Sequence, residues 1–201
     1  MATRKKTAPK GKKSSKASPP LKKRAGRWVV RALALAFVLA VLLVLLFRFV
    51  NPPTGVYMLS ESRRLGGVQR DWVPLEQIAP VMAHAAVAAE DANFCNHWGF
   101  DMQAIRTAIE NGSARGASTI SQQTVKNVYL WHGRSWLRKA LEAGMTPLVE
   151  TLWPKRRIIE VYLNVAEFDE GVFGVGAAAP HYFGVAAADL SPTQAARLAA
   201  I

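Results

Sequence analysis

The feature that most constrains this chain is an almost wholly apolar run from Trp28 to Val50. Residues 32–47 carry no charge, and Arg31 and Arg48 stand on either side of them. At about 1.5 Å per residue, a helix of this length spans about 34 Å, which is enough for a hydrocarbon core of about 30 Å. The run therefore predicts one transmembrane helix over residues 28–50.

Basic residues are concentrated before this helix. Residues 1–31 contain twelve of the 26 Lys and Arg and no acid, so the formal net charge of +12 belongs to this end of the chain. Residues 1–27 are rich in Lys, Ser, Ala, Pro and Gly, a composition that cannot bury enough apolar surface to fold, and we expect a disordered tail. Positive charge before a span holds the N-terminus in the cytoplasm, so the remainder of the chain faces outward.

A cleaved signal peptide and a nucleic-acid-binding tail are the alternatives for this end of the chain. The apolar run exceeds a normal signal core, and residues 48–52 lack the small residues of a cleavage site. A basic tail can bind nucleic acid, but here it adjoins a span and is explained by membrane orientation. We therefore expect a retained anchor in the lipid bilayer and no nucleic-acid partner.

Patterns after the anchor predict a mainly α fold. Residues 51–72 are expected to be a linker that begins with a helix-ending Asn-Pro-Pro, and residues 73–201 a single helical domain. No strand-like alternation is persuasive. Helices are expected at 75–92, 102–109, 119–129, from 135 onward, 155–163, 177–182 and 192–200.

Pro147 should kink or end the helix that follows Ser135. The last pattern reaches Ile201 without a C-cap residue, which suggests that the domain continues beyond it.

The first polar cluster surrounds Glu90, which closes the apolar stretch 85–89. A carboxylate beside an apolar surface is costly unless it is paired or protonated, which makes Glu90 a candidate general base or acid. The alternative is a helix-end acid that faces solvent. His84 and His97 have no second His or Cys at ligand spacing, so we expect both to be structural hydrogen-bonding residues. Cys95 is the only cysteine, cannot form an internal disulfide, and is expected to be a packing residue.

The second cluster lies where Thr119 and Gln122 fit a capping box. A capped helix N-terminus offers free N–H groups and a positive dipole end, which suit an anion. The side chains on one helical face, or beside it, are Ser118, Thr119, Gln123, Lys126 and Asn127. An ordinary polar helix face is the alternative.

The third cluster places Arg138 and Lys139 on one helical face with Glu142, and Arg134 precedes them. This set is either a solvated ion-pair patch, worth tenths of a kcal/mol, or a cradle for a diphosphate. The three clusters together supply two carboxylates and four cations. Such a set suits displacement of a diphosphate from a sugar, in which one carboxylate accepts the proton of the attacking hydroxyl and the cations stabilise the departing charge.

Five motifs in order now identify a resemblance. They span residues 90–101, 116–127, 138–142, 155–164 and 171–184. On these motifs the chain resembles the peptidoglycan glycosyltransferases, the family also found fused to penicillin-binding domains, and is most similar to its stand-alone form, the monofunctional biosynthetic peptidoglycan transglycosylases. The resemblance covers roughly residues 72–201. It implies a lysozyme-like helical domain behind the anchor.

The resemblance also implies an activity, a substrate and a location. The enzyme would polymerise lipid II into glycan strands, invert the donor anomeric carbon from α to β, and release undecaprenyl diphosphate at the outer face of a bacterial inner membrane. Glu90 would be the base, and Glu142 the second catalytic carboxylate. The diphosphates would be bound by Gln123, Lys126, Arg134 and Lys139, with Ser118 and Thr119 lining the groove. Mg²⁺ or another divalent cation is expected to assist, and no organic cofactor is expected.

Some positions leave alternatives open. Gly176 stands where many relatives carry Glu, and Pro147 interrupts a helix that is usually continuous; both are taken as structural. The main alternative function is a lysozyme-type hydrolase, against which the cations argue. A membrane scaffold that recruits division proteins is a third, and division or cell-wall synthesis proteins are further candidate partners beside lipid II and the nascent glycan.

Overall fold

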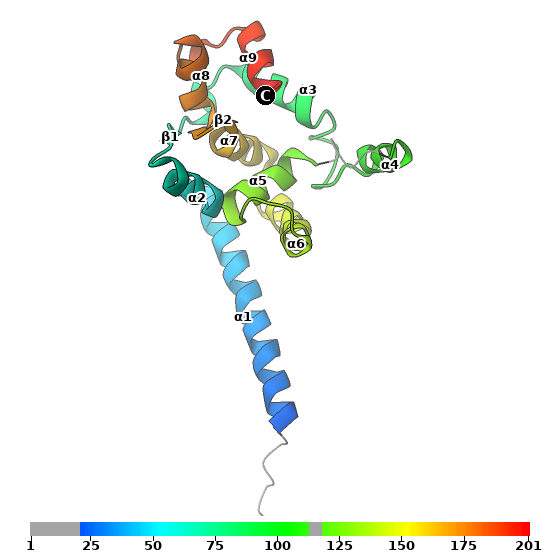
Figure 1. The fold of residues 1–201 in the computed structure, drawn as a ribbon. Helices are drawn as coiled ribbons and strands as arrows, with labels where there is room; N and C mark the ends of the chain where they lie inside the picture. The colour runs from blue at the N-terminus through cyan, green and yellow to red at the C-terminus, as the bar shows by residue number, and fades with distance from the viewer. Residues whose placement is uncertain (1–20, 113–117) are drawn as a thin grey trace, which may run out of the picture. The chain divides into compact units, whose positions relative to one another are not determined.

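A computed structural model describes residues 21–112 and 118–201 and shows a mainly helical protein, as expected (Figure 1). The chain divides into two compact units, Met1–Ala40 and Val41–Ile201. Most of the expected disordered tail falls on residues 1–20, and the start of the second motif falls on residues 113–117; both lie outside the described residues.

Helix α1, Leu21–Phe49, covers the predicted span of residues 28–50 except for its last residue. It begins earlier than predicted, so residues 21–27, which we expected to belong to the disordered tail, are helical. Its apolar side chains between Trp28 and Leu39 are exposed, an arrangement that is unfavourable in water. Gly26–Phe49 is long and apolar enough to cross a membrane. Length, composition and exposure therefore all agree with the predicted anchor.

The segment expected to be a linker is instead part of the second unit. It forms α2, Val56–Leu65, which packs against α5, and β1, Gln69–Arg70, which pairs with β3. The linker expectation for residues 51–72 was wrong, since two local signals in this segment favour a helix. Gly55 and Gly66 flank α2, and Gly66 takes the left-handed conformation that ends many helices.

Most of the remaining helices match the expected positions closely, but the stretch expected over residues 75–92 is divided at residues 78–79, and a short helix at residues 187–189 was not predicted. Their bounds are η1 Leu75–Gln77, α3 Pro80–Glu90, α4 Met102–Glu110, α5 Ile120–Tyr129, α6 Trp136–Leu152, α7 Lys155–Val165, α8 Val175–Phe183, η2 Ala187–Asp189 and α9 Pro192–Ala199. Pro147 does not end α6, which continues to Leu152. Buried side chains on both sides of the proline, Thr146 and Val149, pack this helix into the domain, and this packing offsets the hydrogen bond that proline cannot make.

The core forms where α5 packs against α2, α6 and α7, while α3 packs against α9 (Figure 1). Helix α7 is the most buried of these elements, with Ile158, Val161 and Leu163 fully enclosed. Because α5 is surrounded by packed helices, the polar side chains on its remaining face are held in fixed positions.

A small sheet, which the sequence patterns did not predict, closes one side of this core. Its order is β1-β3-β2, with β2 at Glu167–Asp169 antiparallel to β3 at Val172–Phe173. Gly174 follows at φ 80°, and a Cβ there would lie 2.8 Å from the carbonyl oxygen of Asn164. The fifth motif thus contains a glycine that the backbone itself requires. Gly176 is equally confined, since a Cβ there would lie 2.4 Å from the Asp71 carbonyl oxygen, which supports its structural interpretation.

Candidate active site

The N-terminus of α5 is fixed by the predicted capping box. The Thr119 hydroxyl accepts from the Gln122 N–H at 3.2 Å, and the Gln122 side chain accepts from the Thr119 N–H at 3.0 Å. The same hydroxyl donates to the Gly99 carbonyl at 2.7 Å and is buried. Thr119 was predicted to line the substrate groove, and it lines a cavity together with Ser118, while its hydroxyl holds two segments of the protein together.

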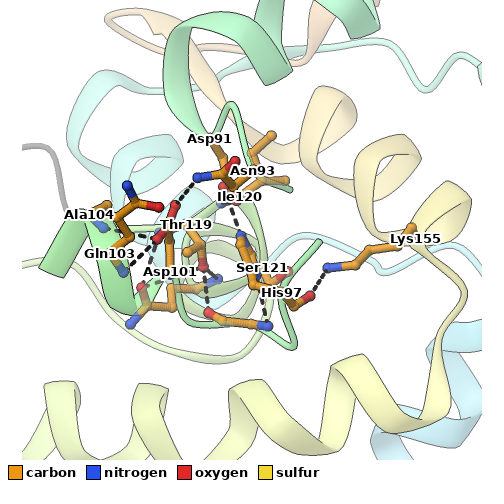
Figure 2. Close-up of polar contacts among 12 residues, drawn as sticks. Asp91, Asn93, His97, Asp101, Gln103, Ala104, Thr119, Ile120, Ser121 and Lys155 are labelled. Atoms are coloured by element: carbon orange, nitrogen blue, oxygen red, sulfur yellow. Dashed lines mark hydrogen bonds and ion pairs between the residues drawn. The ribbon is translucent and has the colours of Figure 1, made fainter. Parts of the chain in front are cut away.

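Asp91 and His97 support this helix end from the first motif (Figure 2). Asp91 is 6 % exposed; one carboxylate oxygen accepts from the Ile120 N–H at 3.0 Å, and the other lies 2.8 Å from His97 Nε2. The Gly99 N–H donates to His97 Nδ1 at 3.1 Å, so Nε2 carries the proton shared with Asp91. His97 is thus the structural hydrogen-bonding residue that we expected, and Asp91 places negative charge at the positive end of α5.

Further polar contacts tie the same region to α6 and α7. Lys155 donates to the His97 carbonyl and to Glu150, each at 2.8 Å, and Ser121 of α5 donates to Glu150 (Figure 2 shows Ser121 and Lys155). Asp101 caps α4 by accepting from the N–H groups of residues 103 and 104. The bond from residue 104 foremost, and next a bond from the Asn93 amide, hold the pKa of Asp101 below its usual range. The first motif is therefore largely a scaffold.

Glu90 ends α3 with its side chain exposed, not packed against apolar surface as we predicted. The Gln123 amide donates to Glu90 Oε2 at 2.6 Å, which fixes the carboxylate and leaves Oε1 free of a hydrogen bond from any described residue. The expectation of desolvation was wrong because Glu90 occupies the final turn, where the helix opens onto two cavities. One, of about 490 Å³, also contains Ser118; the other, of about 230 Å³, is described next.

The cavity of about 230 Å³ brings together four predicted residues: Glu90, Gln123, Lys126 and Asn127. Among the described residues, the Lys126 ammonium has no hydrogen-bond or ion-pair partner. Its burial lowers the pKa of the ammonium, and Glu142 and Glu90 act in the opposite direction. A desolvated cation without a partner is costly unless a ligand supplies the opposite charge, so this position suits an anion.

Glu142 lies on α6 and is 3 % exposed. Arg138 Nη1 lies 2.7 Å from one of its oxygens, and Lys139 pairs with the other. This is a buried, charge-neutralised carboxylate, not the solvated ion-pair patch of the alternative interpretation. The charges of Arg138, Lys139 and Glu142 act on the Lys126 ammonium, as that of Glu90 does, so Lys126 is near both this cluster and Glu90.

Arg134 is not drawn into the cluster. It lies exposed in the loop before α6, and within the described part of the chain no hydrogen bond or ion pair joins it to Glu142. Cys95 and His84 also differ from expectation, since both are exposed. Cys95 follows the end of α3 in the turn-rich segment of the first motif, and His84 lies on the outer face of α3.

Three residues that the sequence patterns did not single out complete the cavity. Tyr57, His132 and Glu167 line it and also a neighbouring cavity of about 840 Å³. Tyr57 donates to Glu167, its ring lies 4.3 Å from that of His132, and burial raises the pKa of its hydroxyl. Recognition of α2 from its flanking glycines would have placed Tyr57 on a helix, but its place in the cavity depends on how that helix packs.

The expected divalent cation has no ready site among these side chains. Within residues 21–112 and 118–201, no three His, Cys, Asp or Glu residues lie close enough to hold a metal ion. Both Glu142 oxygens already face cations. The Mg²⁺ expectation stays a prediction, and no chemical step below passes through it.

Comparison with known proteins decides the family. The transglycosylase family model matches residues 58–201. This chain belongs to the transglycosylase family. It is 58 % identical over 196 residues to the biosynthetic peptidoglycan transglycosylase of Jannaschia sp. strain CCS1, covering 98 % of this chain and 82 % of that protein.

More distant relatives carry the same name. The biosynthetic peptidoglycan transglycosylase of Pseudomonas fluorescens strain Pf-5 is 52 % identical over 186 residues, covering 87 % of this chain and 77 % of the relative. That of Caulobacter vibrioides is 48 % identical over 188 residues, covering 88 % and 82 %. The chain is thus a peptidoglycan glycosyltransferase of cell-wall synthesis, and the lysozyme-like fold expected of this family agrees with its helical structure. Neither the hydrolase nor the scaffold alternative is supported.

Proposed function

We propose that this transglycosylase polymerises lipid II into glycan strands at the outer face of the bacterial inner membrane and releases undecaprenyl diphosphate. The observation that carries the proposal is one cavity that contains the exposed Glu90 carboxylate and the Lys126 ammonium, which has no partner in residues 21–112 and 118–201. One group can accept a proton and the other can receive a phosphate, and the transfer of a sugar from a diphosphate needs both functions.

The chemical step is a single displacement. The 4-hydroxyl oxygen of the acceptor lipid II attacks the anomeric carbon of the growing chain while the bond from that carbon to the diphosphate oxygen breaks. The hydroxyl proton passes to Glu90 Oε1, since Oε2 already accepts from Gln123. Attack opposite the leaving group inverts the anomeric carbon from α to β. General-base help of this kind is worth about 10²–10⁴ in rate.

The departing diphosphate needs positive charge. Lys126 supplies it at the cavity, and the Arg138 and Lys139 cations supply more from the adjacent cluster, where buried Glu142 fixes both. We assign Glu142 to the orientation of these cations. Arg134, exposed in the preceding loop, and Ser118, in the neighbouring cavity, could reach the substrate once it is bound. Preorganised cations of this type stabilise charge without reorganisation during the reaction.

The anchor accounts for the location. The excess of Lys and Arg before the span favours a cytoplasmic N-terminus and so supports a periplasmic catalytic unit. There it meets a substrate whose polyprenyl chain lies in the same bilayer.

The test is gel analysis of labelled lipid II incubated with the purified full chain, with and without the phosphoglycolipid antibiotic moenomycin. Wild type should give long strands, and moenomycin should block them. Glu90→Gln should reduce strand formation by about 10² or more, whereas Glu76→Gln, an exposed acid outside the cavities that contain Glu90, should leave it unchanged. Normal polymerisation by Glu90→Gln would refute the base assignment, and clearing of purified sacculi by wild type would favour a hydrolase.

A further inference from the structure

The last turns of α1 belong to the catalytic unit, which begins at Val41. Val44 is fully buried and Phe47 is 9 % exposed, so this end of the helix is packed into the domain. A helix that served only as a tether would keep its side chains free of the domain. The packing here indicates a second role for the end of the anchor.

Arg157 of α7 holds this helix end through its carbonyl oxygens. Its guanidinium donates to the Phe47 carbonyl at 3.1 and 3.2 Å and to the Val50 carbonyl at 2.9 Å. It also donates to the Asn51 side chain at 3.0 Å and to Glu160 at 2.7 Å. The last carbonyls of a helix have no partner within the helix and carry its negative dipole end, so a cation there is doubly favourable.

Aromatic rings enclose the same contact. The Arg157 guanidinium lies 5.6 Å from the centre of the Trp72 ring and 6.0 Å from that of Trp153. Trp153 Nε1 in turn donates to the Val44 carbonyl at 2.7 Å. A planar cation with five donors fits such a site, and lysine, with a single ammonium, does not.

We propose that Arg157 is a positioning residue that locks the end of the membrane anchor to the catalytic helices and so sets how far the active site stands from the bilayer. Helix α7, which carries Arg157, also supplies Tyr162 to the Glu90 cavity and packs against α5, which carries Lys126. The lock and the site therefore share one rigid element. The proposal rests on the proposed function, because distance from the bilayer matters only if the substrate is held in it.

The experiment compares Arg157→Met with Arg156→Met in the full chain. Arg156 is the adjacent residue, and its only ion pair among the described residues is an exposed one with Glu76, so it controls for the loss of one arginine from α7. Each variant receives long-chain lipid II in vesicles and a short-chain, water-soluble analogue in detergent. Arg157→Met should lose about ten-fold or more of its activity in vesicles and keep wild-type activity on the soluble analogue, while Arg156→Met should match wild type in both.

Equal activity of the two variants in vesicles would overturn the proposal. So would an equal loss by Arg157→Met on both substrates, since that pattern indicates general damage to the domain. If wild type itself fails to polymerise lipid II, the proposed function fails, and the lock is then decided by a measurement that needs no turnover.

That measurement uses spin labels at Leu46 and Thr193, both exposed, in a Cys95→Ser background. The distance distribution in vesicles should be narrow with Arg157 and Arg156→Met and broad with Arg157→Met. Trp153→Phe, which keeps an aromatic ring but removes the bond to Val44, provides a milder variant should Arg157→Met fail to fold, and should broaden the distribution partly. An unchanged distribution in these variants would refute the lock.

Discussion

At the scale of single residues, the site depends on one lysine that burial has made unusual. Lys126 shares a cavity with Glu90 and is near the Glu142 cluster, its pKa is lowered by desolvation, and no described residue pairs with it. The protein thus maintains a costly charge where a phosphate would relieve the cost. Stability and function are opposed at this position, as they often are at binding sites.

This opposition predicts a pH dependence of ligand binding. Because the pKa of Lys126 is lowered, the ammonium loses its proton at a pH below the ordinary lysine value of about 10.4. The dissociation constant of a short-chain polyprenyl diphosphate should therefore rise as the pH rises through that lowered pKa. In Lys126→Arg it should stay flat over the same range, because arginine remains protonated. Titration calorimetry across the alkaline range measures both, and a parallel rise in the two proteins would contradict the assignment.

At the scale of elements, two capping boxes offer a matched comparison. Thr119 caps α5, which carries Gln123 and Lys126, and Ser191 caps α9 with the same geometry at an exposed position. Thr119→Ala should cost about 1–2 kcal/mol and also reduce polymerisation, because the hydroxyl additionally holds Gly99. Ser191→Ala should cost about 1 kcal/mol with activity retained.

Thermal unfolding and initial rates at a temperature well below both midpoints separate these effects. At about 2–4 °C per kcal/mol for a domain of this size, both variants should melt measurably below wild type. If Thr119→Ala keeps full activity despite a lower melting temperature, the cap stabilises the fold without positioning the site.

The elements also show what the sequence could predict. Helices α5 and α9 were predicted correctly because their start signals are local: a capping residue and its partner three positions later for α5, and a serine followed by a proline at the first turn for α9. The sheet was missed because its strands are two or three residues long and exist only through pairing between distant segments, such as Gln69 with Val172.

The site residues likewise fall into those that a local pattern predicts and those that depend on packing between distant segments. Glu90, Gln123, Lys126 and Asn127 were found because each lies in a local motif, and one cavity joins them. The exposure of Glu90 and the participation of Tyr57 depend on how α2 and α3 pack, and no pattern within either segment reports that packing.

At the scale of the whole molecule, the asymmetry of charge about the span predicts its orientation, and Cys95 provides the means to measure it. Cys95 is the only cysteine and is exposed on the catalytic unit. In cells with a permeabilised outer membrane, a membrane-impermeant maleimide should therefore label the wild-type protein before the inner membrane is broken. A Ser14→Cys variant in a Cys95→Ser background should be labelled only after lysis, because the twelve positive charges of residues 1–31 are expected to keep that end in the cytoplasm.

The two proteins serve as controls for each other, since each has a single thiol and the same anchor. Labelling in the opposite order would place the Glu90 cavity in the cytoplasm, away from a glycan strand that grows outside. Labelling of both proteins before lysis would mean that the two labelled positions are not on opposite sides of the inner membrane, as a single crossing of the span requires. Either result would contradict the proposed location without contradicting the proposed chemistry, because Glu90 and Lys126 would remain competent for transfer. The charge asymmetry would then need another explanation, such as attachment to an anionic lipid surface.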